Sequence, residues 1–362
     1  MGDMKILYVA HGDFWGSTWP YAFIDHYIAS TLKSMGHEVK TYNIFAQVTT
    51  MSDFYREVAK KQNLTEGHLL GILDDRASAP IPFEILDFEP DLMLHIVGRI
   101  PNRILKAIKK LKTKTAIWYL DDPQEINFTS VNGAYYDHVY TVEPSCVAEH
   151  KNGKFLPLGC FTHIYKPMEV EEKYKSDICF IGVPFPRRVE FFDEMADFLK
   201  NYNVKIIGGG PNVGRADDPW MWKKKLKRLD VLDKFITDEI IFPEEAAKYY
   251  NGAKINLNLH RAGTDDRFTH GNPKNIQPIG VSERTFCIAG CGGFQLIDNY
   301  RSNLSEQFEA GKEIAVFADN EDFKKKIIYY LEHEAERKKI GEAAQKRVLA
   351  EHTYEQRLKR IL

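Results

Sequence analysis

Short apolar runs alternate with longer amphipathic segments along the whole chain. Lys5–Ala10 (KILYVA) is a continuous apolar run, as expected for a strand of a parallel sheet that is covered on both faces. Residues 21–35 then place their apolar side chains on one helical face and end at Gly36, a favourable residue just past a helix. The pattern predicts further strands over 38–44, 92–97, 115–120 and 138–142, and a helix over 104–111. Strands and helices in this order indicate right-handed βαβ units in a doubly wound sheet.

The same rhythm restarts in the second half of the chain. Strands are expected over 177–182, 204–207, 254–259, 293–297 and 314–317, with helices over 244–250 and 284–289 and a long helical tail, 321–362, broken near Gly341. The polar, irregular passage Cys160–Ser176 is typical of an interdomain connection. The fold class is therefore α/β, with two similar doubly wound domains and a cleft between them. We place them at residues 1–165 and 166–345, followed by a C-terminal helix over 346–362.

Composition agrees with two globular domains and excludes several classes of protein. The chain has 362 residues, 44% of them hydrophobic and 28% charged, which is ordinary for a soluble protein. Its 49 Lys and Arg balance 51 Asp and Glu, so binding of nucleic acid mainly by bulk charge is not expected. The five cysteines are scattered without metal-binding spacing, as in reduced cytosolic proteins. No apolar stretch approaches the roughly 18 residues that span a membrane. We expect a cytoplasmic protein with no membrane span.

Two loops of the first half carry candidate chemistry directly after predicted strands, where ligands bind in doubly wound sheets. The first loop contains His11, Gly12 and Gly16. Its glycines let the backbone approach a ligand closely, and its histidine could act as a general base. A packed loop histidine is the alternative. The second contains Asp121 and Asp122 before Pro123, a pair that could orient an acceptor hydroxyl or act as a base. An ordinary aspartate cap or turn is the alternative there.

The second half contains a glycine loop and a helix start with an arginine. Gly208–Gly210 follow a predicted strand and permit close approach of a ligand, but the spacing matches neither a dinucleotide-binding fingerprint nor a P-loop. Ser282 precedes the predicted helix, and Arg284 lies in its first turn, a combination that suits a diphosphate. An ordinary capped helix with a surface arginine is the alternative. The basic run 223–228, which follows Trp220 and Trp222, fits a solvated helix face better than a nucleic-acid site.

Taken in order, several segments resemble the GT-B glycosyltransferases of the CgeB-like type. These segments are MKILYV, WYLDDP, YDHVYTVEPS, FLPLG, DICFIGVPFPRR, YYNGAKINLNLH, SERTFCIAGCGGFQLID and RVLAEHTYEQRLKRIL, and they span nearly the whole chain. The resemblance implies two Rossmann-like domains facing a central cleft. It also implies a nucleotide-sugar donor on the C-terminal domain, acceptor contacts on the N-terminal domain and a last helix that packs back on the first domain.

Transferred residue by residue, the resemblance gives a set of candidates. His11 and Asp122 are the candidate catalytic residues, with Gly12, Gly16 and Asp121 on the acceptor side. The donor-binding candidates are Arg188, Gly208, Gly209, Gly210, His260, Glu283, Arg284, Thr285, Phe286, Cys287 and Asp298. One departure stands out. Related retaining enzymes have a glutamate for the donor ribose where this chain has Cys287, and Glu283 or Asp298 are the possible substitutes.

The implied activity is transfer of a sugar from a nucleotide-diphosphate donor, with UDP favoured, to a hydroxyl of a glycan, a protein or a modified nucleic acid. No metal and no cofactor beyond the donor is expected. Three alternatives stay open: a phage-type DNA-base glycosyltransferase, a sugar-nucleotide epimerase or hydrolase, and a non-catalytic spore or surface-assembly protein of the same fold. The donor sugar, the stereochemical outcome and the oligomeric state are left open.

Overall fold

The computed structural model describes residues 2–10, 20–63, 65–96, 100–209, 220–263 and 271–362. The chain divides into two compact units. The first comprises Met1–Leu156, His270–Lys274 and Leu358–Leu362, and the second comprises Pro157–Thr269 and Asn275–Arg357. A short segment of the second half and the last five residues thus fold with the first unit.

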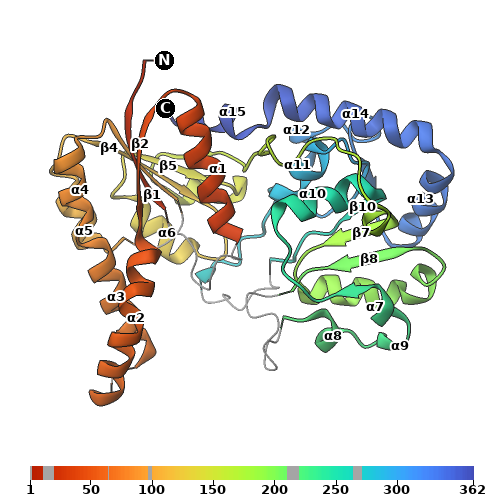
Figure 1. The fold of residues 1–362 in the computed structure, drawn as a ribbon, viewed down its shortest axis with the longest axis horizontal. Helices are drawn as coiled ribbons and strands as arrows, with labels where there is room; N and C mark the ends of the chain where they lie inside the picture. The colour runs from red at the N-terminus through yellow and green to blue at the C-terminus, as the bar shows by residue number, and fades with distance from the viewer. Residues whose placement is uncertain (1, 11–19, 64, 97–99, 210–219, 264–270) are drawn as a thin grey trace. The chain divides into compact units, whose positions relative to one another are not determined.

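The first unit is built on a parallel sheet of six strands in the order β2-β1-β3-β4-β5-β6. Its strands are β1 (Lys5–Ala10), β2 (Glu38–Asn43), β3 (Leu92–Ile96), β4 (Lys114–Tyr119), β5 (His138–Thr141) and β6 (Gly153–Phe155). Its helices are α1 (Pro20–Ser34), α2 (Ile44–Lys61), α3 (Glu66–Ser78), α4 (Ile81–Phe88), α5 (Asn102–Ile108) and α6 (Ile126–Gly133). In Figure 1, α4 and α5 lie on one side of these strands and α1 on the other.

Alternation along β1 explains why both faces of this sheet are covered. Leu7 and Val9 belong to one buried cluster with residues of α2–α5, whereas Tyr8, on the opposite face, donates a 2.6 Å hydrogen bond to Asp25 on α1. All three side chains are fully buried. The continuous apolar run read from the sequence is therefore the signature of a doubly covered strand.

The sequence pattern assigned no strand or helix to residues 45–91, and here the structure differs. They form α2, α3 and α4. Their apolar positions are interrupted by polar ones, as in α2. Burial of Leu69, Leu73, Ile81 and Ile85 in the cluster under the sheet stabilises these helices. Tertiary packing, rather than local propensity, therefore determines this part of the fold.

The second unit also has a six-stranded parallel sheet, in the order β12-β11-β10-β7-β8-β9. Its strands are β7 (Ser176–Ile181), β8 (Val204–Ile207), β9 (Ile236–Thr237), β10 (Ala253–Asn258), β11 (Gln295–Asp298) and β12 (Ala315–Phe317). Its helices are α7 (Pro186–Leu199), α8 (Trp222–Lys225), α9 (Leu229–Leu232), α10 (Pro243–Gly252), α11 (Glu283–Gly290), α12 (Leu304–Gln307), α13 (Asn320–Glu332), α14 (Glu334–Glu351) and α15 (Tyr354–Leu358), the last ending in the first unit. This strand order is that of a Rossmann sheet.

Gly341 does not break the tail, contrary to the prediction. Helix α14 runs through it from Glu334 to Glu351, and the interruptions fall at His333 and His352. A Cβ on Gly341 would lie within 2.5 Å of the carbonyl oxygen of Gly292, so the glycine allows α14 to pack closely on the loop after α11. Its role is close packing between segments distant in the sequence, not termination of a helix.

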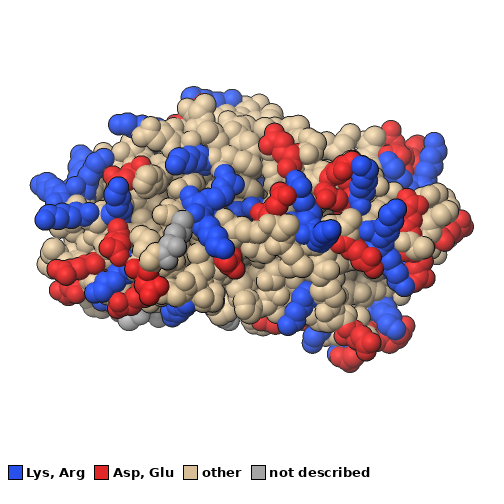
Figure 2. Space-filling model, turned by 90° about the horizontal axis from the view of Figure 1, so that it is seen from above, with Lys and Arg blue, Asp and Glu red and all other residues tan. Residues whose placement is uncertain are grey.

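The outer surface of the second unit carries mixed charge. Figure 2 shows Lys and Arg side chains interspersed with Asp and Glu over this part of the molecule. Along α13 and α14, Lys326 pairs with Asp322 and Lys338 with Glu334 at i,i+4 spacing. Such pairs are typical of a solvated helix surface, as expected from the balanced composition.

Candidate functional site

The second sheet has a topological switch point between β7 and β10. These strands are neighbours, yet β8 and β11 follow them on opposite sides. Ligands of doubly wound sheets bind in the crevice outside the carboxyl ends of the strands at such a point. Here Gly182 follows β7, and His260 lies two residues beyond β10.

Gly182 lies at a place where two backbone segments approach closely. Gly208, which follows β8, has a φ of +123°, and a Cβ on it would lie 2.8 Å from the carbonyl oxygen of Gly182. The same oxygen accepts a 3.0 Å hydrogen bond from Nε1 of the fully buried Trp222. Gly209 is buried beside Gly208, whereas Gly210 lies outside the described residues. The glycine loop predicted from the sequence thus packs closely against Gly182, a residue that the sequence analysis did not single out.

We expect Gly208→Ala to destabilise the protein more than Gly311→Ala. Both glycines have positive φ, but a Cβ on Gly311 meets nothing within 4 Å. The two variants share the cost of a left-handed backbone, about 1–2 kcal/mol, and Gly208→Ala adds the collision with Gly182. Overpacking of this kind adds about 1–3 kcal/mol, which urea denaturation of both variants measures. Equal losses in the two variants would contradict the close approach.

Two guanidinium groups flank Gly182. A Cβ on this residue would lie 3.0 Å from Nη2 of Arg284 and 3.2 Å from Nη1 of Arg188. Arg188 Nε donates to the carbonyl of Leu259 at 3.0 Å, and Arg284 Nη1 donates to Asn258 Oδ1 at the same distance. Burial lowers the pKa of Arg284, but an arginine stays charged at neutral pH. Backbone and amide oxygens therefore hold two positive charges beside a position that lacks a side chain.

The N-terminus of α11 lies in the same region. Ser282 is its N-cap residue, but its side chain makes no capping hydrogen bond, and its buried Oγ has no partner among the residues that the structure describes. A helix start normally leaves several N–H groups unpaired, and with the positive end of the helix dipole they favour an anion. Arg284 is the second residue of this helix. The arrangement suits a phosphate or diphosphate.

His260 and Asp298 form a buried pair at the ends of β10 and β11. Asp298 Oδ1 lies 2.7 Å from His260 Nδ1, and Oδ2 accepts hydrogen bonds from the His260 amide at 2.8 Å and from Arg187 Nη1 at 2.6 Å. Burial lowers the pKa of His260 to about 4. The ring is therefore neutral, with Nδ1–H donated to Asp298 and Nε2 accepting a 3.5 Å hydrogen bond from the Ser282 amide. Although burial alone would raise it, the pKa of Asp298 is held well below its usual range by its bonds to His260 and Arg187.

Both acidic candidates for a ribose ligand make hydrogen bonds within the protein. Both oxygens of Asp298 are used within the protein, as described above. Glu283 accepts a 2.5 Å hydrogen bond from Tyr354 Oη on α15, and burial raises the pKa of its carboxyl to about 7. These contacts favour a positioning role for both residues over the predicted contact with ribose.

The next residues of α11 also contact protein. Thr285 is fully buried and accepts a 3.0 Å bond from Asn258 Nδ2, and the ring of Phe286 lies against Phe308. Burial raises the pKa of the Cys287 thiol well above its usual value. These side chains pack against protein and hold the helix in place. Only the backbone groups of residues 285–287 are therefore candidates for direct contact with the donor.

Sequence reasoning missed four residues of this region, Gly182, Arg187, Asn258 and Trp222. Arg187 is next to the predicted Arg188, and its guanidinium stacks 4.2 Å from the ring of Tyr300. A signal existed for Gly182, since it ends the predicted strand 177–182. For Asn258 and Trp222 the sequence gave no signal, because Arg284, which contacts Asn258, lies 26 residues away in the chain and Gly182, which contacts Trp222, lies 40 residues away.

In the first unit, Asp122 lies at the end of β4 in a fully buried network. Its carboxylate accepts hydrogen bonds from Thr129 Oγ1 at 2.7 Å and Thr141 Oγ1 at 2.8 Å, and it pairs with His150 Nε2 at 2.7 Å. A general base must reach the proton that it removes. The geometry therefore favours a structural role for Asp122 over the predicted catalytic one. Asp121 is half-buried beside it, and the predicted His11, Gly12 and Gly16 lie outside the described residues.

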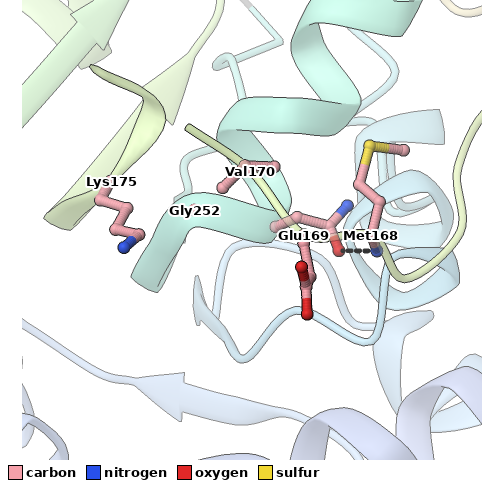
Figure 3. Close-up of a pocket in the computed structure, with 6 residues that line it drawn as sticks. Met168, Glu169, Val170, Lys175 and Gly252 are labelled. Atoms are coloured by element: carbon pink, nitrogen blue, oxygen red, sulfur yellow. Dashed lines mark hydrogen bonds between the residues drawn. The ribbon is translucent and has the colours of Figure 1, made fainter. Parts of the chain in front are cut away.

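A shallow hollow of about 360 Å³ is lined by Met168, Glu169, Val170, Lys175, Asn251 and Gly252 (Figure 3). The amide of Met168 donates to Asn251 Oδ1 at 2.9 Å, the bond drawn in the figure. Because β7 begins at Ser176 and β10 at Ala253, the hollow lies at the amino ends of these strands. It is therefore at the opposite edge of the sheet from Gly182 and His260.

Two further observations concern metals and membranes. Within the described part of the chain, no three His, Cys, Asp or Glu side chains gather closely enough to hold a metal ion. Among the helices that the structure describes, none is both long and apolar enough to cross a membrane. Metal independence and cytoplasmic location stay predictions.

The chain is similar to known proteins over nearly its whole length. Residues 187–362 match a family model described as glycosyl transferase-like. The spore protein CgeB of Bacillus subtilis (strain 168) is 28% identical over 298 residues, which are 80% of this chain and 87% of CgeB. Among solved structures, sucrose-phosphate synthase from Thermosynechococcus elongatus is similar, with a TM-score of 0.63 and 12% identity over 99% of this chain and 97% of that one. HepE of Anabaena, solved in complex with UDP-glucose, has a TM-score of 0.61 and 11% identity over 99% and 98% of the two chains.

These findings confirm the resemblance and the fold class inferred from the sequence. The structural likenesses establish the fold, and the family model covers the part of the chain that contains Arg188, His260 and Arg284. The chain thus has the GT-B fold, is similar to CgeB along most of its length and matches a glycosyl transferase-like family model over residues 187–362.

Proposed function

We propose that this protein is a glycosyltransferase that moves a sugar from a nucleotide-diphosphate sugar, with UDP as the expected nucleotide, to a hydroxyl group without a bound metal. The observation that carries the proposal is the pair Arg188 and Arg284, which flank Gly182 near the uncapped start of α11. The complex of HepE with UDP-glucose supports the choice of nucleotide.

The proposed chemistry follows from the charge of the donor. The bond between the anomeric carbon and the β-phosphate oxygen breaks, a bond to the acceptor oxygen forms, and negative charge develops on the departing diphosphate. Arg284 and the first amides of α11 would stabilise that charge in a fixed arrangement, which lowers the barrier more than mobile water does. The acceptor loses its proton to a base, for which His11 stays the predicted candidate, or to the departing phosphate in a retaining reaction.

The test is release of UDP from UDP-glucose and UDP-N-acetylglucosamine, with and without a pool of hydroxyl acceptors. We expect release to rise when acceptors are added, together with a glycosylated product detected by mass spectrometry. We also expect EDTA to leave the rate unchanged. Equal release without acceptors would identify a hydrolase, and failure of the wild type to bind UDP would overturn the proposal.

A further inference from the structure

The first unit carries a strongly basic segment along α5 and the turn that follows this helix. The stretch Arg103–Lys114 contains no Asp or Glu, although the chain as a whole has slightly more acidic than basic residues. Six of its twelve residues are basic and exposed to solvent: Arg103, Lys106, Lys109, Lys110, Lys112 and Lys114. Positive charge is therefore concentrated on one helix of a nearly neutral protein.

Acidic neighbours lie only at the two ends of this segment. Arg103 Nη2 pairs with Asp75 at 2.6 Å, and the backbone amide of Lys114 donates a 3.3 Å hydrogen bond to the carbonyl of the exposed Asp91. The four lysines between these ends make no ion pair within the described part of the chain: Lys106, Lys109, Lys110 and Lys112. Their charges therefore face water.

Helix α4 adds large apolar side chains beside these lysines. It contacts α5, and both helices lie on the same side of the sheet (Figure 1). Ile85 of α4 and Ile108 of α5 are buried in one cluster against that sheet. Because each helix turns its buried side toward the sheet, the exposed residues of both helices lie on a common outer surface. On α4 these include Phe83 and Leu86, which are 68% and 57% exposed.

The acidic residues of α4 reduce the positive charge of this outer surface without cancelling it. Glu84 pairs with Lys40 at 2.6 Å, and Asp87 is exposed. Against Asp87 stand the four lysines of α5 that make no ion pair. The outer surface of α4 and α5 thus combines net positive charge with two apolar side chains that water solvates poorly.

We propose that the outer surface of α4 and α5 binds the surface of a membrane that contains anionic phospholipids. The lysines would meet the headgroup phosphates, and Phe83 and Leu86 would enter the boundary between headgroups and acyl chains. Phosphates of a nucleic acid would also attract the lysines, but such contacts use charged and polar groups and would leave Phe83 and Leu86 exposed. The proposal is independent of the proposed function, because it concerns where the protein binds and not which reaction it performs.

The direct test is flotation of the full-length protein with vesicles at about 0.1 M NaCl, where charges within about 10 Å still interact. We expect binding to vesicles of equal parts phosphatidylcholine and phosphatidylglycerol, and none to phosphatidylcholine alone. Replacing Lys109, Lys110 and Lys112 together by alanine should weaken this binding about 100-fold, since each basic residue contributes about fivefold.

A matched control removes the same charge from the second unit. Lys223, Lys224 and Lys225 are also exposed, and their replacement by alanine should leave vesicle binding within about twofold of wild type. Equal losses in the two triple variants would show that total charge, and not this surface, attracts the protein, and would overturn the proposal. Failure of the wild type to bind the mixed vesicles would overturn it as well.

A second variant tests the apolar contribution and separates a membrane from a nucleic acid. Phe83→Ser combined with Leu86→Ser changes no charge, and its Tm should match that of wild type because both side chains are exposed. We expect at least about tenfold weaker binding to the mixed vesicles, because two apolar side chains lose their burial in the bilayer. Wild-type affinity of the double variant for these vesicles would overturn the proposal. Binding of duplex DNA through the same lysines would then assign the surface to a nucleic acid.

Discussion

Arg284→Ala is expected to raise the Kd for UDP about 10- to 150-fold, the equivalent of about 1.5–3 kcal/mol for charge-assisted hydrogen bonds. One nitrogen of this guanidinium is held by Asn258 and the Leu259 carbonyl, and the other lies next to Gly182. The side chain is thus positioned by the protein before a diphosphate arrives. Isothermal titration with UDP measures the effect.

Two comparisons make this prediction specific. Arg284→Lys keeps a charge but cannot bond Asn258 and a phosphate with one planar group, so we expect it to recover only part of the affinity. Arg228→Ala removes a surface arginine that pairs with Asp197 and Asp230, and it should leave the Kd unchanged. If Arg284→Ala binds UDP as tightly as Arg228→Ala, the diphosphate does not lie at α11.

Asp298→Ala is expected to lower the free energy of unfolding by about 3–5 kcal/mol, the usual loss when one partner of a buried charged pair is removed. The substitution leaves His260 Nδ1 and the Arg187 guanidinium without their acceptor. Because Arg187 is 30% exposed, water recovers part of the loss, and a value near the lower end is expected. Urea denaturation at pH 7 gives the difference.

The pH dependence of this difference follows from the direction of the pKa shift. The pKa of Asp298 is lowered in the folded protein, so its contribution is complete above the unfolded value of about 4 and is lost as the pH falls through the folded value. The gap between wild type and Asp298→Ala should therefore be constant from pH 7 to about 5 and shrink only in stronger acid. As a control, Asp197→Ala removes a mostly exposed carboxylate and should change stability little. A gap that closes already near pH 6 would contradict the arrangement.

Sequence reasoning located the strands and the region of the site better than it assigned roles within them. Continuous apolar runs such as Lys5–Ala10 predict doubly covered strands, and their alternation with helices predicts parallel sheets. Gly208 and His260 come directly after predicted strands, and the structure places them after β8 and β10.

The roles of individual residues were harder to predict from the sequence, because each role depends on partners that are distant in the chain. Glu283 and Asp298 were candidates for binding ribose, yet one contacts Tyr354, 71 residues away, and the other contacts Arg187, 111 residues away. Asp122 similarly contacts His150. Whether a carboxylate binds a ligand or stabilises a loop depends on its neighbours in space. The hydrophobic pattern of the sequence does not reveal those neighbours.

The measurement that tests the central claim most directly is a crystal structure of the wild-type protein with UDP. We predict diphosphate oxygens within about 2.7–3.2 Å of Arg284 and of the first amides of α11. We also predict that the Gly182 and Gly208 backbones will lie beside the nucleotide. UDP bound elsewhere, with Arg284 and the start of α11 making no contact to phosphate, would contradict the account.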